Sequence, residues 1–137
     1  PSEMYGRRIV NQTTNLTTGN HLMFDTNLFT TGSLISLDIT SPYSSATNTA
    51  SIGRITLTGG HTYYLETWVI QFAGTTLEIS WYNSDTNTLI DGPTGNGIKG
   101  TLTVYTPAIN TRIEARITSS LLVTAINRVF VKARSLN

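Results

Sequence analysis

The chain contains no cysteine, few charged residues and no long hydrophobic run. Charged residues make up 12% of its 137 residues, about half of the fraction that is usual in a soluble domain. Without cysteine, disulfides, thiolate metal sites and cysteine nucleophiles are excluded. No apolar stretch approaches the roughly 18 residues that a membrane-spanning helix needs, and residues 1–18 lack the apolar core of a signal peptide. We therefore expect no membrane partner.

The charge balance also argues against nucleic acid as a partner. The formal net charge is +1, which provides no general basic surface for phosphate groups. Low net charge together with 13 Ile, 13 Leu and 6 Val argues against a disordered chain. A length of 137 residues suits one domain with a modest core.

Small polar residues dominate the composition, with 25 Thr, 12 Ser and 11 Asn. Thr, Ile, Val and aromatic residues favour strands, whereas Asn, Ser and Gly favour turns. Apolar residues recur with a period of two rather than 3.6, and turn signals separate the runs. This pattern predicts eight to ten short strands in an all-β sandwich or barrel. The expected strands are residues 21–29, 33–40, 52–58, 62–72, 76–83, 88–90, 101–106, 109–118 and 128–136; residues 119–127 leave room for one helical turn.

The strand predicted over residues 62–72 has two apolar faces. Leu65 and Val69 lie on one face, and Trp68, Ile70 and Phe72 lie on the other. A sandwich strand normally buries one face and exposes the other to solvent. Either a segment of the same chain covers the second face, or another subunit does. The small size of the chain favours another subunit.

An ordered set of short motifs resembles phage-encoded jelly rolls of the C1q/tumour-necrosis-factor-like (C1q/TNF-like) class. The motifs are residues 55–66 (ITLTGGHTYYLE), 80–83 (SWYN), 87–90 (NTLI), 105–107 (YTP), 112–118 (RIEARIT) and 126–128 (INR). The resemblance implies a two-sheet antiparallel jelly-roll sandwich that forms a homotrimer on a virion. It also implies that strands 62–72, 101–106 and 128–136 face the threefold axis. The candidate trimer-interface residues are Tyr64, Trp68, Ile70, Phe72, Tyr105 and Phe130.

The polar N-terminus, residues 1–20, is expected to form an extended arm ahead of a jelly-roll domain over residues 21–137. Pro1 is what removal of an initiator methionine would leave, which favours a complete small gene product over the tip of a long fibre chain. The arm would then lie on the capsid or clasp a neighbouring subunit. The candidate docking residues are Tyr5, Arg7, Arg8, Ile9 and Val10.

The C-terminal quarter is basic, with Glu114 as its main opposing charge. The candidate basic-surface residues are Arg112, Arg116, Arg128, Lys132 and Arg134. One interpretation is contact with an acidic capsid surface or with surface glycans. The other is a solvated strand face whose charges pair with acids on neighbouring strands.

No motif in the chain predicts catalysis or a cofactor. His21 and His61 could ligate a metal with Asp25 or Glu66, but the two histidines do not form the closely spaced pair of a metal site. Residues 85–92 resemble only part of a calcium loop, and residues 92–99 depart from a phosphate-binding loop in spacing and context. We expect no cofactor, no metal and no enzymatic activity.

The sequence thus predicts a non-enzymatic virion protein, a trimeric decoration or cement protein bound to the major capsid protein on the outer capsid surface. The alternative is a receptor-binding tip domain on a tail-fibre or spike shaft, which would recognise host glycan. In that alternative Tyr43, Trp81 and Tyr82 would stack on sugar rings if exposed; for Trp81 the competing interpretation is core packing.

Overall fold

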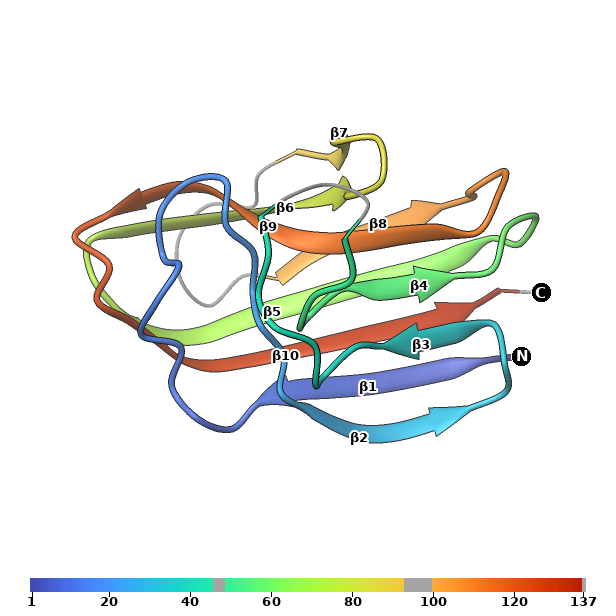
Figure 1. Ribbon diagram of the computed structural model, residues 1–137, viewed down its shortest axis with the longest axis horizontal. Coiled ribbons are helices and arrows are strands. Elements are labelled where there is room, and N and C mark those ends of the chain that lie inside the picture. Colours follow the sequence, from blue (N-terminus) through green and yellow to red (C-terminus); the bar gives the residue numbers. More distant parts are fainter. Residues whose placement is uncertain (46–48, 93–99, 137) are drawn as a thin grey trace.

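Ten β-strands make up the regular structure of the protein (Figure 1), a computed structural model that describes residues 1–45, 49–92 and 100–136. No part of this described chain forms a helix long and apolar enough to cross a membrane. The strands are β1 (Glu3–Arg8), β2 (Thr26–Thr31), β3 (Ile35–Leu37), β4 (Ile55–Leu57), β5 (Tyr63–Ala73), β6 (Thr76–Asn83), β7 (Thr88–Asp91), β8 (Gly100–Tyr105), β9 (Thr111–Leu121) and β10 (Ala125–Ser135).

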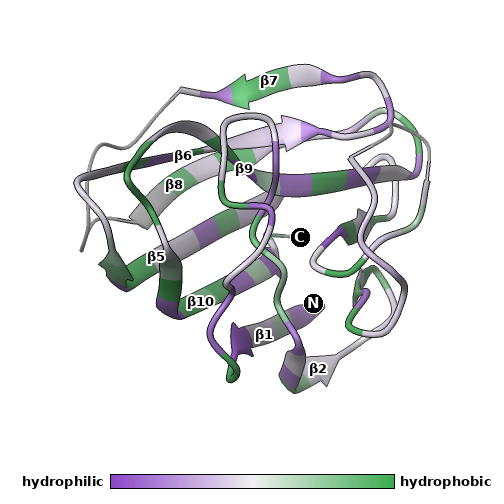
Figure 2. Cartoon of the chain, turned by 60° about the vertical axis from the view of Figure 1, so that its left-hand side comes forward, coloured by the Kyte–Doolittle hydropathy of each residue, from purple (hydrophilic) through white to green (hydrophobic). Residues whose placement is uncertain are grey.

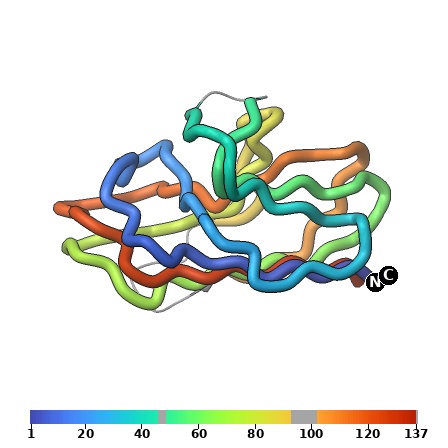
Figure 3. The backbone as a smooth tube through the Cα atoms, turned by 60° about the horizontal axis from the view of Figure 1, so that its bottom comes forward, coloured from blue at the N-terminus to red at the C-terminus, as the bar shows by residue number. Residues whose placement is uncertain are grey.

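The strands form two five-stranded antiparallel sheets. Sheet A has the order β2-β1-β10-β5-β8, and sheet B has the order β3-β4-β9-β6-β7. The first and last strands, β1 and β10, are hydrogen-bonded neighbours, and the two termini lie together at one end (Figures 1 and 3). The prediction of a two-sheet antiparallel sandwich is confirmed.

The core lies between the sheets and is built by alternation along the strands. In β5, Tyr63, Leu65, Thr67 and Val69 are buried while the residues between them are partly or fully exposed. Figure 2 shows β5, β10 and β1 side by side, with hydrophobic and hydrophilic positions intermixed along them. The largest fully buried side chains are Trp81, Tyr63, Phe24, Met4, Leu22, Ile55, Leu57, Leu65, Leu77, Ile113, Ile117 and Ile126.

Residues 1–20 are part of the sandwich, which differs from the extended arm expected for this range. β1 lies between β10 and β2 in sheet A. Its inward positions are Met4 and Gly6, where a Cβ atom would lie 2.6 Å from Leu37 Cδ2. The small residue therefore lets the two sheets approach closely.

Residues 9–25, here called the strap, leave sheet A after β1, reach sheet B and return to sheet A at β2. Gln12 exchanges two backbone hydrogen bonds with Ile126 of β10. The amide of Leu22 then donates to the carbonyl of Ala115 in β9 at 2.8 Å. Leu22 and Phe24 are fully buried in the core, so the strap packs against its own domain.

Most expected strands are present, with differences at their ends. The strand expected over residues 21–29 is β2 (Thr26–Thr31), because residues 21–25 belong to the strap, and β3 and β4 are shorter than the expected 33–40 and 52–58. A further correction lies between β9 and β10. The expected helical turn within residues 119–127 is absent, because β9 continues to Leu121 and β10 begins at Ala125. Leu122, with a φ of 54°, makes the tight connection. A chain that reverses in three residues leaves no room for a helical turn.

Candidate functional site: the outer face of sheet A

The outer face of sheet A carries an apolar surface to which all five strands contribute. Strand register places Phe130 of β10 beside Trp68 of β5 and Arg7 of β1. In the neighbouring row Lys132 lies between Tyr5 and Glu66, and Glu66 pairs with Leu102 of β8. Side chains on the same face of adjacent strands touch, so these rows form one continuous surface.

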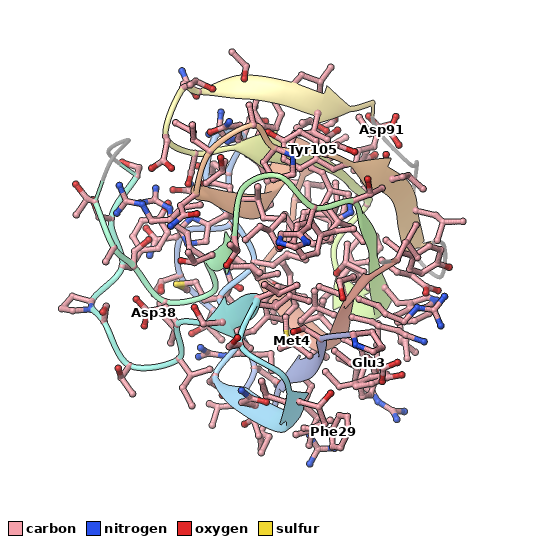
Figure 4. The ribbon with its side chains drawn as sticks, turned by 90° about the vertical axis from the view of Figure 1, so that its right-hand side faces the viewer. Glu3, Met4, Phe29, Asp38, Asp91 and Tyr105 are labelled. Carbon is pink, nitrogen blue, oxygen red and sulfur yellow. The ribbon has the colours of Figure 1, made fainter. Side chains whose placement is uncertain are left out.

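Large apolar side chains are exposed on this face. Leu102 and Val104 of β8 are 56% and 59% exposed, and Ile70 of β5 is 39% exposed. Leu28 and Phe29 of β2 are 51% and 47% exposed, and the Phe29 ring lies 5.8 Å from the Tyr5 ring. Figure 4 shows Phe29 and Glu3 pointing away from the sandwich on the same side, whereas Met4 lies inside.

A hollow of about 330 Å³ opens in the middle of this face. Its lining is almost entirely apolar and comes from four strands. The residues around it are Tyr5, Gly6, Leu28, Trp68, Ile70, Phe130, Val131 and Lys132. A contiguous apolar patch of this kind on a small domain marks a surface that binds protein or ligand.

Charges of both signs are aligned across the strands beside the hollow. Glu3 aligns with Arg134, and Lys132 aligns with Glu66. The Lys132 ammonium lies 5.0 Å from the centre of the Tyr5 ring, and the Arg134 guanidinium lies 5.7 Å from that of Tyr64. The hydrogen bond to Tyr5 raises the pKa of Lys132, and desolvation raises the pKa of the Tyr64 hydroxyl.

Four of the six predicted interface residues lie on this face. Tyr64, Trp68, Ile70 and Phe130 alternate with buried residues along β5 and β10. Phe72 and Tyr105 instead pack against the core cluster between the sheets. For Phe72 the reason is a bulge in the neighbouring strand β10, which aligns it with the fully buried Ile126.

The sequence analysis missed the apolar contributions of β2 and β8. Leu28, Phe29, Leu102 and Val104 are exposed on or beside the face. In the sequence, apolar Leu102 and Val104 alternate with polar Thr103, and this pattern could have placed Leu102 and Val104 on one face of the strand. For Leu28 and Phe29 no local signal exists, because their position depends on the pairing of β2 with β1.

The outer face of sheet B is organised around a buried acid. Glu114 of β9 is 2% exposed, and its Oε1 atom accepts a hydrogen bond from Arg54 Nε at 3.1 Å. Its other oxygen accepts one from Arg116 Nε at 3.0 Å and lies 3.7 Å from His21 Nδ1. Arg54 is only 3% exposed, so this ion pair is closed off from water.

The strap and residues 38–45 and 49–54, here called the loop, cover this acid. The Nε2 atom of His21 in the strap lies 2.8 Å from the carbonyl oxygen of Ile52 in the loop, and its ring stacks on Tyr43 with centroids 4.9 Å apart. Gly53 has a φ of 90°, and a Cβ atom there would lie 2.2 Å from the Leu22 carbonyl oxygen. Glycine is therefore needed where loop and strap backbones touch.

Burial lowers the pKa of His21 below its usual value, and the nearby Arg54 and Arg116 act in the same direction. The Glu114 carboxylate and the hydrogen bond to Ile52 oppose this shift without cancelling it. The imidazole is therefore neutral at neutral pH, because the buried ring cannot be hydrated once charged.

The predicted basic surface is divided between the two faces. Arg112 forms a 2.8 Å ion pair with Asp85, and Arg116 lies between Glu114 and the Tyr82 ring, 3.9 Å from its centre. These two belong to sheet B. The other three residues, Arg128, Lys132 and Arg134, lie along β10 in sheet A. No single basic stripe exists.

The predicted docking residues of the arm also occupy different positions. Tyr5 and Arg7 lie on the outer face of β1, and Arg8 ends this strand. Ile9 and Val10 begin the strap and are 55% and 64% exposed. These five residues are therefore fixed within the domain.

The remaining side chains considered for chemistry are not gathered into a site. Trp81 is fully buried, as the core interpretation expected. Tyr43 lies on His21 and Tyr82 lies under Arg116. Among the described residues no three His, Asp or Glu side chains group to hold a metal ion. Residues 93–99 of the glycine-rich loop lie outside the described residues.

Comparison with known proteins identifies the fold. No protein-family profile matches the chain, and no curated protein matches it by sequence. Among solved structures, murine APRIL is similar with a TM-score of 0.63 and 10% identity over 98% of both chains. GITRL from pika is similar with a TM-score of 0.56 and 11% identity, covering 99% of this chain and 97% of its own. The chain has the C1q/TNF-like jelly-roll fold.

Proposed function

We propose that the chain is a non-enzymatic structural protein of a phage virion that works as a homotrimer. The observation that carries this proposal is the exposed apolar outer face of sheet A, with Trp68, Ile70 and Phe130 around its hollow. Burying this face against other copies would remove apolar area from water at about 25 cal/mol for each Å². The lining offers hydrophobic contact rather than groups that transfer protons.

The sheet order supports three copies as the occupants of this face. The class resemblance implies that strands 62–72, 101–106 and 128–136 surround a threefold axis. The corresponding strands β5, β8 and β10 are neighbours in the order β10-β5-β8. The exposed side chains that they share, Trp68, Leu102 and Phe130 among them, would meet the same sheet of the next subunit.

Within the virion, we assign the trimer to the outer capsid surface as a decoration or cement protein bound to the major capsid protein. The resemblance to phage jelly rolls implies a place on the virion, either on the capsid or at a fibre or spike tip. The lectin-like alternative at a fibre tip has less support, because Trp81 is buried and Tyr43 and Tyr82 are covered by His21 and Arg116. Aromatic rings that are already covered do not stack on sugars.

The docking residues expected on an extended arm lie within the folded domain instead. Deleting residues 1–20 would remove β1 from between β2 and β10 and would take Met4 and Leu16 out of the core. Such a deletion would unfold the domain rather than separate docking from trimer formation. The capsid contact therefore has to come from side chains that the folded domain exposes.

Sedimentation velocity at micromolar concentration tests the trimer. We expect the wild-type chain to sediment with three times the 15.0 kDa monomer mass. Trp68→Glu should sediment as a folded monomer, because a carboxylate would be buried in the apolar interface. The matched control is Leu89→Glu, since Leu89 is 54% exposed on β7 of the opposite sheet. A monomeric wild type would refute the proposal.

Cryo-microscopy of the particle that carries this chain tests the location. The proposal expects trimeric density on the outer capsid surface at local symmetry axes. Density at the end of a tail fibre would refute the capsid assignment and support the receptor-binding alternative.

A further inference from the structure

A second pocket, of about 150 Å³, lies on sheet A at the end opposite the termini (Figure 1). Three arginines line it: Arg7 and Arg8 from the end of β1, and Arg128 from the start of β10. Phe130 belongs to the lining of both this pocket and the apolar hollow. The pocket therefore adjoins the hydrophobic part of the face, and no acidic residue lines it.

A bulge in β10 builds this pocket. The pairing of β10 with β5 shifts register on both sides of Arg128, which aligns with Gln71. Asn127 is the extra residue, and Asn127 and Arg128 both line the pocket. A bulge redirects side chains that regular alternation would have separated. Here it brings the guanidinium of Arg128 to the pocket that the end of β1 also lines.

Two of the three arginines lack a countercharge. Arg8 lies 3.5 Å from Asp25, and its guanidinium donates to the carbonyl oxygens of Val10 and Met23. Arg7 and Arg128 form no ion pair or side-chain hydrogen bond within the part of the chain that the structure describes. The Nε atom of Arg7 is moreover buried without an acceptor, which is unfavourable for a charged donor.

Asp25 cannot supply this countercharge, because its carboxylate is already occupied. Its two oxygens accept hydrogen bonds from the backbone amides of Ile9 and Val10 at 2.8 and 3.2 Å, and the Thr26 hydroxyl donates to it as well. Burial would raise the pKa of Asp25, but these hydrogen bonds and Arg8 hold it below its usual value. Asp25 thus fixes the pocket wall at Ile9.

The rest of the face leaves no acid for this pocket either. Its other cations, Lys132 and Arg134, align with Glu66 and Glu3. The uncompensated charges of Arg7 and Arg128 therefore repeat in every copy of the chain. A trimer formed through this face would carry three such pairs near its rim, where polar groups normally surround an apolar interface.

We propose that the pocket of Arg7 and Arg128 binds a carboxylate, supplied by an Asp or Glu side chain of the protein on which the trimer docks. A guanidinium fork matches the two oxygens of a carboxylate. The volume of about 150 Å³ is well below the roughly 300 Å³ at which small-molecule pockets begin, which favours one side chain over a sugar or nucleotide. Carboxylate binding by this pocket does not depend on the proposed function. Only the claim that the carboxylate belongs to the protein on which the trimer docks rests on that function.

Carboxylate binding can be measured on the isolated full-length chain. The probe is N-acetyl-glutamate α-amide, which has one carboxylate, titrated at constant ionic strength against ¹⁵N-labelled protein. We expect saturable shifts of the side-chain Nε–H signals of Arg7 and Arg128. Arg128→Gln should raise the dissociation constant at least tenfold. Arg112→Gln, which removes the same charge from the opposite sheet, is the matched control and should leave the constant unchanged.

Several outcomes would overturn the assignment. N-acetyl-glutamine α-amide producing the same shifts would show that no carboxylate is recognised. An equal loss of probe affinity in Arg112→Gln, or equally tight binding of inorganic sulfate, would show that the probe is held by general electrostatic attraction rather than by a carboxylate site. Stronger binding of N-acetylneuraminic acid than of the glutamate probe would show that the pocket recognises an acidic sugar instead of a protein side chain.

Capsid co-sedimentation separates this proposal from the trimer proposal. Arg128→Glu should remain trimeric and lose capsid binding, whereas Trp68→Glu should lose the trimer and keep probe binding. A monomeric wild type that still binds the probe would refute the trimer alone. Capsid binding by Arg128→Glu at wild-type strength would refute the docking role of the pocket.

Discussion

The outer faces of the two sheets are built from the same strand geometry but are closed in different ways. On sheet B, the strap and residues 38–45 and 49–53 cover Glu114 and Arg54, so charged groups are buried by the chain itself. On sheet A, no segment among the described residues covers the hollow that Trp68, Ile70 and Phe130 line, and apolar groups such as Ile70 remain exposed. Within the described chain, its own segments thus cover the charged cluster but not the apolar face.

This contrast also bears on the two explanations for the apolar second face of β5. The strap reaches sheet B through Gly19, Asn20 and Leu22, which hydrogen-bond to Ile117 and Ala115. In sheet A it bonds to the start of β10 through Gln12 and to the end of β1 through Asp25, and the hollow beside Trp68, Ile70 and Phe130 stays open. The described part of the chain thus provides no cover for this face, as the proposed homotrimer expects.

The largest effect should come from breaking the buried ion cluster of sheet B. Glu114→Gln leaves the charge of Arg54 buried with no carboxylate partner, which costs about 3–5 kcal/mol of unfolding free energy. Urea unfolding measures this loss. The matched control, Glu78→Gln on the neighbouring strand β6, should change stability by less than about 0.5 kcal/mol. A loss below about 1 kcal/mol in Glu114→Gln would mean that the cluster is open to water.

The apolar face of sheet A should instead affect how the Tm depends on protein concentration. Because assembly stabilises only the folded chain, the Tm of the wild type should rise with concentration, by the equivalent of about 2.7 kcal/mol at 100 times the dissociation constant. Trp68→Glu should melt at one temperature at every concentration. Differential scanning fluorimetry over a hundredfold dilution provides the measurement. A concentration-independent wild type would contradict an interface on this face.

Lowering the pH should destabilise the folded chain through His21, which lies in the strap that covers sheet B. The pKa of His21 is lowered in the folded state, so between that pKa and about 6.5 the unfolded chain binds a proton that the folded chain does not. Stability is therefore greatest above pH 6.5 and falls as the pH decreases, by at most about 1.4 kcal/mol per pH unit. Urea unfolding at several pH values between 7.5 and 5 measures the slope.

The variant His21→Gln should flatten this slope, because glutamine does not titrate. In His61→Gln, which removes the other histidine, the effect of His21 should persist. An identical slope in wild type and His21→Gln would exclude the buried imidazole as its source.

The smallest effect on the free energy of unfolding is expected for the partly exposed ion pair of Arg112 and Asp85 on sheet B. Arg112→Gln removes the 2.8 Å contact with Asp85, but both side chains are about one quarter exposed and the Arg112 amide still donates to Asp85. Partly solvated pairs contribute about 0–1 kcal/mol, and we expect a loss within that range in urea unfolding. A loss above 2 kcal/mol would show that the network on sheet B acts as one unit.

Local alternation was sufficient to predict most strands. The strand predicted over residues 76–83 is β6 (Thr76–Asn83), and residues 62–72 correspond to β5 (Tyr63–Ala73). Burial alternates along β5 as the period of two requires. Such patterns are readable because each strand contacts the core through every second side chain.

Two features were not predictable because they depend on distant partners. β1 is polar, and its inward side carries only small or flexible residues such as Gly6 and Met4. Its place in sheet A comes from pairing with β10, which no local pattern reveals. Glu114 was likewise expected on a solvated face, and only Arg54 and His21, brought from other parts of the chain, make it a buried acid.

The candidate site was predicted in part for the same reason. Trp68, Ile70 and Phe130 follow from alternation within single strands. The arginine pocket does not, because a bulge at Asn127 is needed to place Arg128 near Arg7. Bulges arise from the pairing of two strands, so one strand's sequence carries little sign of them.

The pairing of β1 with β10 has a consequence for biosynthesis. The amide of Ser2 donates to the hydroxyl of Ser135, 133 positions further along the chain. At about 5–20 residues per second, a ribosome needs on the order of ten seconds to make the intervening polypeptide. During that time β1 has no β10 to bond with, and β5 lacks the neighbour that separates it from β1. Sheet A can therefore close only when residues 125–135 have emerged from the ribosome, and a nascent chain stalled before them should still need chaperone protection.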